Sequence, residues 1–138
     1  MNETIIKNWN GVVTNNDIVY FLGDMKCGGK TDIDYWLEQL NGKIFYIQGN
    51  HDMNIITKAT VLPNKFLIYR DKQKFLLMHE PVRPEWFKGW IIHGHIHNND
   101  LINYPFINKE KKTVNVSVEL TNYTPVNLDV ILEKIKNV

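Results

Sequence analysis

The sequence is poor in the features that mark secreted and membrane proteins. Cys27 is the only cysteine among 138 residues, so no disulfide can form within the chain, and we expect a reducing compartment. No window holds 18 consecutive apolar residues, and residues 1–11 lack the basic stretch and apolar run of a signal peptide. These absences predict a soluble cytoplasmic protein with no membrane partner.

A strong charge of either sign is also lacking. The chain carries 16 basic and 15 acidic side chains, for a formal net charge of +1. A protein that binds polyanions across its surface needs clustered lysine and arginine, so nucleic acid is expected as a substrate only. Apolar residues make up 43% and charged residues 22%, which excludes wholesale disorder. We expect residues 1–138 to form one domain with one core.

The first half of the chain alternates between helical and strand patterns. Apolar residues at helical spacing predict an amphipathic helix within residues 1–13, and a capping box at 31–34 predicts a helix that continues to Leu40. Short apolar runs at 18–22 and 44–47 are typical of strands buried on both faces. This alternation favours parallel strands covered by helices, and hence an α/β fold.

The second half is richer in strand patterns. We expect a short helix at 53–60, strands at 65–69 and 74–78 joined by a turn at 70–73, a strand at 90–92, a half-exposed strand at 113–120 and a last helix at 128–135. The total is six or seven strands, arranged in two facing sheets.

Histidine is absent before His51, and all five histidines lie between His51 and His97. Residues of metal-ligating types follow four apolar runs directly: Gly23-Asp24, Gly49-Asn50-His51-Asp52, His79, and Gly94-His95-Ile96-His97. Because sites in open α/β sheets gather at the carboxyl ends of strands, we expect these side chains to converge. Oxygen and nitrogen ligands without thiolate exclude a structural zinc finger, and they suit Mn, Fe, Zn, Co or Ni.

These four segments, in this order and spacing, resemble the calcineurin-like metallophosphoesterase superfamily along most of the chain. Residues 115–118 and 122–126 are similar to those of its small bacterial and phage members. The resemblance implies a β-sandwich of two facing mixed sheets flanked by helices. It also implies hydrolysis of phosphomonoesters or phosphodiesters, in which a hydroxide bound to divalent transition metal ions attacks phosphorus.

The resemblance assigns a role to each motif residue. Five side chains would bind two metal ions: Asp24 would bridge them, Asn50, His79 and His95 would complete the second site, and His97 would belong to the first. His51 would bind the phosphate and protonate the leaving group, and Asp52 would orient His51. Capping of the following helix is a competing interpretation for Asp52.

One part of the family pattern is missing. The family begins with an Asp-x-His motif at the end of an N-terminal strand, and nothing in residues 1–17 matches it. The first metal site therefore keeps only Asp24 and His97, and the sheet loses a strand whose neighbours would expose free edges. We expect a second copy of the chain or a rearrangement to fill that position, which makes a homo-oligomer an expected partner.

Three hypotheses follow from this gap. The chain is an active metal-dependent phosphoesterase, or it is a catalytically impaired or inactive metal-binding module that holds one ion instead of two. In the third hypothesis Met1 is an internal methionine, and an Asp-x-His strand lies upstream.

Other residues near these motifs have more ordinary interpretations. His93 lies outside the pattern, and we expect it to have a structural or supporting role. Cys27 is interpreted as part of a loop beside the site. Trp86, Phe87 and Trp90, close to Arg83, could stack on a nucleobase, but aromatic residues in such positions more often belong to the core or its rim.

Overall fold

The computed structural model describes residues 3–22, 38–47 and 60–136, which form two β-sheets and two α-helices. The first sheet has the order β1-β2-β3 and is wholly parallel. Its elements, with the preceding helix, are α1 (Glu3–Val12), β1 (Ile18–Phe21), β2 (Lys43–Ile47) and β3 (Thr60–Leu62). The predicted first helix, the first two strands and their parallel arrangement are confirmed. The predicted helix at 31–40 lies largely outside the described residues, as does the one at 53–60, except that Thr60 begins β3.

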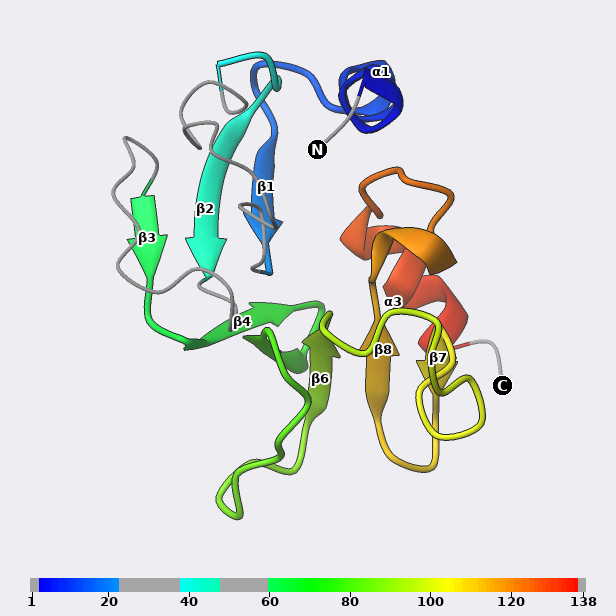
Figure 1. Ribbon diagram of the computed structural model, residues 1–138. Helices are drawn as coiled ribbons and strands as arrows, with labels where there is room; N and C mark the ends of the chain where they lie inside the picture. The colour runs from blue at the N-terminus through cyan, green and yellow to red at the C-terminus, as the bar shows by residue number, and fades with distance from the viewer. Residues whose placement is uncertain (1–2, 23–37, 48–59, 137–138) are drawn as a thin grey trace.

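The second sheet is mixed and has the order β4-β5-β6-β8-β7. Its strands are β4 (Lys65–Arg70), β5 (Gln73–Met78), β6 (Trp90–His93), β7 (Ile107–Asn108) and β8 (Thr113–Asn115). A 3₁₀ helix, η1 (Val118–Leu120), and the predicted last helix, α3 (Leu128–Lys136), follow. Figure 1 shows α1 beside the smaller sheet and α3 beside β8 and β7. The described residues hold eight strands instead of the predicted six or seven. β3 and β7 were missed because strands of two or three residues carry little sequence signal.

The turn between β4 and β5 is tighter than predicted. Arg70 pairs with Gln73, so only Asp71 and Lys72 form the loop, with φ of 52° and 66°. Two consecutive positive φ values are the mark of a type I′ turn, whose twist matches that of the flanking strands. The strand pairing therefore extends one residue further on each side than the predicted turn at 70–73 allowed.

Within the described residues, β1 pairs only with β2. Ile18 is 59% exposed, and Val19, Tyr20 and Phe21 are half-buried. Apolar residues pack against both faces of β1, but its free edge leaves the side chains partly open. The prediction of a strand buried as completely as β2 was therefore wrong.

The apolar core is divided among three clusters. The largest contains residues of both sheets and of α3: Ile47, Phe75, Leu77, Trp90, Ile92, Val114, Ile131 and Leu132. A second cluster, between α1 and the smaller sheet, holds Trp9, Val13, Leu40, Ile44 and Tyr46, and a third holds Leu76, Met78, Phe87 and Ile91. Consecutive residues of β2 and β5 alternate between clusters because both faces of these strands are covered.

The aromatic residues near Arg83 belong mainly to this core. Phe87 and Trp90 are buried, whereas Trp86 is 68% exposed and contacts Phe87 with its ring edge. The Arg83 guanidinium donates hydrogen bonds to four backbone carbonyls, those of Phe87, Gly89, Lys111 and Lys112, at 2.7–3.2 Å. Arg83 thereby joins the loop before β6 to the turn before β8, which is a structural role.

We predict that Arg83→Met lowers the free energy of unfolding by about 2–3 kcal/mol, because four carbonyl groups lose a charged donor. The sequence has one other arginine, Arg70, which makes an exposed ion pair with Asp129 at 2.9 Å. Arg70→Met is the matched control and should change stability by less than about 1 kcal/mol. Chemical denaturation measures both variants, and equal losses would contradict the structural role of Arg83.

Candidate metal site

The ends of three strands are tied together by hydrogen bonds around His79. The buried His79 side chain follows β5, and its Nδ1 lies 2.7 Å from the carbonyl oxygen of Leu22, just after β1. The His79 carbonyl accepts a hydrogen bond from the backbone N–H of Gly94, just after β6, at 3.0 Å. In Figure 1 the arrowheads of β1 and β6 point toward this central region. The expected convergence of strand ends is therefore present for the described residues.

One ring nitrogen of His79 faces one ring nitrogen of His95. His79 Nε2 lies 3.1 Å from His95 Nδ1, and the ring planes meet at 72°. Because the Leu22 carbonyl can only accept a hydrogen bond, the proton of a neutral His79 is on Nδ1. The lone pair is then on Nε2, the nitrogen that faces His95.

The loop after β6 has a strained backbone. His95 and His97 have φ of 66° and 55°, in the left-handed region that costs a residue with a side chain about 1–2 kcal/mol. Such strain persists only where the surroundings hold it. Here the His97 N–H donates to Ser117 Oγ at 3.2 Å, and the His97 carbonyl accepts from Asn115 Nδ2 at 2.9 Å.

These contacts overturn the prediction of a half-exposed strand at 113–120. β8 ends at Asn115, and the polar residues Asn115 and Ser117 are buried, while Val116 and Val118 are only half-buried. The alternation of polar and apolar residues is real, but its polar side faces the loop of residues 94–97. Ser117 Oγ and Asn115 Nδ2 bond to that loop, and Asn115 Oδ1 accepts from the Ser117 N–H, so these buried polar atoms have partners within the protein.

His97 makes a different side-chain contact from His79 and His95. Its Nδ1 lies 2.9 Å from both carboxylate oxygens of Glu119, in η1. Of the predicted site residues, Asp24, Asn50, His51 and Asp52 lie outside the described residues, as does Cys27. In the remainder, no three His, Cys, Asp or Glu side chains lie close enough together to hold a metal ion.

His93 has the surroundings of a structural residue. It is fully buried, its Nδ1 lies 2.8 Å from the Gly94 carbonyl oxygen, and Tyr104 packs edge-on against its ring. Burial lowers the pKa of His93 to about 4, because the charged imidazolium loses its hydration. The side chain is therefore neutral near pH 7 and supports the loop that carries His95 and His97.

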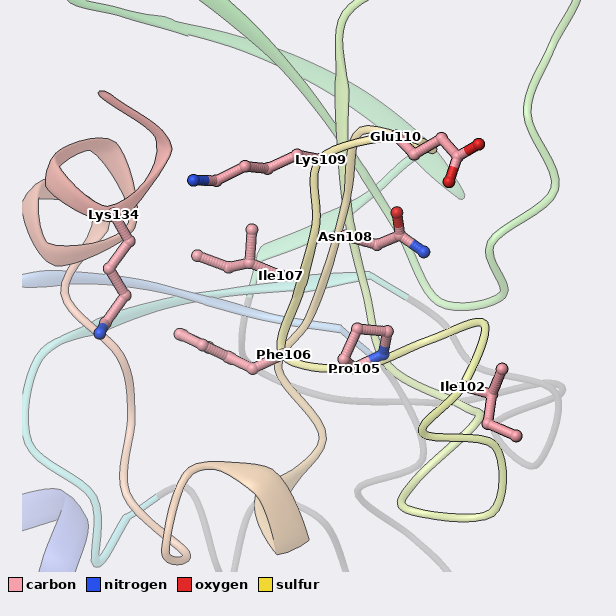
Figure 2. A pocket seen from close by; sticks show the side chains of 8 residues that line it. All are labelled: Ile102, Pro105, Phe106, Ile107, Asn108, Lys109, Glu110 and Lys134. Carbon is pink, nitrogen blue, oxygen red and sulfur yellow. The ribbon is translucent and has the colours of Figure 1, made fainter. Parts of the chain in front are cut away.

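A surface hollow of about 630 Å³ lies elsewhere, between α3 and the segment around β7. It is lined by Ile102, Pro105, Phe106, Ile107, Asn108, Lys109, Glu110 and Lys134. Figure 2 shows the side chains of Phe106 and Ile107 extending toward α3, which carries Lys134. Of the predicted site residues that the structure describes, His79, His95 and His97, none lines this hollow.

The described elements define an α/β protein built on two sheets, and comparisons with known proteins extend that description. The chain is 49% identical to the uncharacterized protein MJ1445 of Methanocaldococcus jannaschii over an alignment 142 positions long, which covers 99% of the chain and 76% of the relative. The chain belongs to the same family as that protein. Comparison with models of protein families gives no match.

A solved structure shares the fold. The protein of unknown function AQ665 from Aquifex aeolicus superposes with a TM-score of 0.66, covering 95% of this chain and 83% of its own. Sequence identity is 20%, so the likeness concerns the arrangement of helices and strands.

Four groups around the histidines were not expected from the sequence. They are the Leu22 carbonyl and the side chains of Asn115, Ser117 and Glu119. A backbone carbonyl leaves no signal in a sequence. The other three occupy alternate positions, and that spacing signalled one shared face without showing what the face contacts.

We predict that His97→Gly is more stable than His97→Ala by about 1 kcal/mol, because only glycine adopts a positive φ without steric cost. Asn98, an exposed neighbour whose φ is not positive, gives the control pair. There the alanine variant should be at least as stable as the glycine variant. Chemical denaturation of the four variants measures the difference, and a His97 pair that follows the Asn98 order would contradict the strained backbone.

Proposed function

We propose that this protein is a metal-dependent phosphoesterase of the calcineurin-like type. The observation that carries the proposal is the pairing of His79 Nε2 with His95 Nδ1 at 3.1 Å. Two imidazole nitrogens bound to one ion at about 2.0–2.1 Å, with angles of about 90–109°, lie about 2.8–3.4 Å apart. The nitrogen pair therefore has the separation that a shared transition metal ion requires.

The orientation of His79 supports the same proposal. A histidine that ligates a metal usually donates its other ring N–H to a carbonyl or carboxylate, which fixes the ring and its tautomer. His79 meets this condition through Nδ1 and the Leu22 carbonyl. In the sequence, Asp24 follows Leu22 by two positions, and Asn50 follows the end of β2 by three, so two candidate oxygen ligands come shortly after strands of the smaller sheet.

The layered core is consistent with the sandwich that the proposal requires. The largest apolar cluster holds Ile47 of the smaller sheet together with Phe75 and Ile92 of the larger one. The second cluster lies on the opposite side of the smaller sheet, under α1. We propose that the two sheets face each other across the shared cluster, in a metallophosphoesterase-like arrangement.

Each residue of the proposed site has its own role in the reaction. Bound divalent ions, of Mn, Fe, Zn or Ni, would supply Lewis acidity and a nucleophile for phosphorus. His79 and His95 would hold one ion, together with Asn50 and Asp24. His51 donates a proton to the departing ester oxygen, and Asp52 orients it. Phosphomonoesters and phosphodiesters are the proposed substrate class.

The test of this proposal is hydrolysis of p-nitrophenyl phosphate and bis(p-nitrophenyl) phosphate by the full chain with added Mn²⁺. We expect turnover that a chelator abolishes and Mn²⁺ restores. His79→Ala and His95→Ala should each lower it by at least about 100-fold, because each removes a metal ligand. His51→Ala should also impair turnover, while Asn98→Ala, in the same loop as His95, should leave it unchanged. A folded wild type without metal-dependent turnover would overturn the proposed activity.

A metal-binding module without catalysis is the second candidate. Residues 1–138 contain no Asp-x-His motif, so they supply only Asp24 and His97 toward the first metal site, and this favours the second candidate. The number of ions per chain, measured by equilibrium dialysis and elemental analysis, separates the two candidates. One ion without turnover supports the module. Two ions with turnover support the enzyme. If binding of the second ion depends on protein concentration, another copy of the chain supplies ligands.

A further inference from the structure

We propose that Glu119 is a positioning residue that fixes the His97 imidazole with Nδ1 protonated, so that Nε2 is available to a metal ion. The inference rests on the proposed function, since it assigns His97 to the metal site. Glu119 belongs to none of the motifs that resemble the superfamily.

The geometry of the pair defines the tautomer. Both Glu119 oxygens lie 2.9 Å from His97 Nδ1. An ionised carboxylate has no proton to donate, so it binds Nδ1 only when that nitrogen carries hydrogen. A neutral His97 held in this way has its lone pair on Nε2. This is the carboxylate–histidine arrangement found at metal centres, where the carboxylate also makes the imidazole a stronger ligand.

The two side chains are partly exposed, which limits what their contact contributes to stability. The His97 side chain is 50% exposed, and that of Glu119 is 22% exposed. A carboxylate–histidine contact at this exposure contributes at most about 1 kcal/mol to stability, because solvent competes for both groups. The contact therefore adds little to stability. Orienting His97 as a metal ligand, in contrast, requires only that its imidazole ring be held in one direction.

The surrounding hydrogen bonds separate the role of Glu119 from that of its neighbours. Ser117 binds the backbone N–H of His97, and Asn115 binds its carbonyl. These two contacts hold the strained loop. Glu119 contacts the imidazole itself, so its removal should alter the ring while the backbone stays in place.

The first experiment uses NMR of the metal-free full chain at about pH 8, where long-range ¹H–¹⁵N correlations show which imidazole nitrogen of His97 is protonated. We expect Nδ1–H in the wild type and loss of that preference in Glu119→Ala. Glu119→Gln retains an oxygen acceptor and should retain part of the preference. Glu85→Gln, at an exposed glutamate, is the control and should behave as the wild type does. An unchanged tautomer in Glu119→Ala would overturn the inference.

The second experiment measures Mn²⁺ affinity by isothermal titration calorimetry. His97→Ala identifies the binding event to which His97 contributes, and Glu119→Ala should weaken that same event by about 10–100-fold. Unchanged affinity in Glu119→Ala would overturn the inference. A wild type that binds no Mn²⁺ would overturn both proposals, whereas metal binding without hydrolysis would overturn only the proposed activity. Thermal unfolding of metal-free Glu119→Ala should match the wild type closely, and a large loss of stability would indicate a structural role instead.

Discussion

The hydrogen bond between the His79 imidazole and the Leu22 carbonyl joins the two sheets at the ends of their strands. Leu22 follows the smaller sheet, and His79 follows the larger one. The backbone bond from Gly94 to His79 adds the end of β6 to the same point. Because a carbonyl accepts and never donates, this contact also decides which nitrogen of a neutral His79 carries the lone pair. This one hydrogen bond thus joins the strand ends and also fixes the tautomer of the His79 imidazole.

The loop of residues 94–97 depends on a second set of contacts. Its two left-handed histidines are held by the segment that follows β8, through Asn115, Ser117 and Glu119. Packing in the cores around Ile92 and Val114 brings β6 and β8 side by side as parallel strands. The strain in the loop is therefore maintained by a segment about 20 residues further along the chain, and not by the local sequence.

Much of the fold follows from short-range pattern. The helical spacing of apolar residues in α1, the β-branched and aromatic runs of β2 and β6, and the last helix α3 were all predicted from the sequence. The errors arose where tertiary contacts override periodicity. Residues 113–120 alternate as a strand does, yet the chain leaves the sheet at Asn115 because its polar side chains bind a loop. The sequence of β1 predicts a strand buried on both faces, yet among the described strands it lies at an edge.

The sequence by itself determined which residue types follow each strand, and it marked His79, His95 and His97 as members of one set. Only the tertiary structure decided that His79 and His95 share a contact while His97 pairs with Glu119. The physical reason is that the periodicity of a chain shows which side of an element a residue occupies, but not what lies opposite. Backbone carbonyls such as that of Leu22 are identical at every position of a sequence, so their role appears only when folding places an imidazole against one of them.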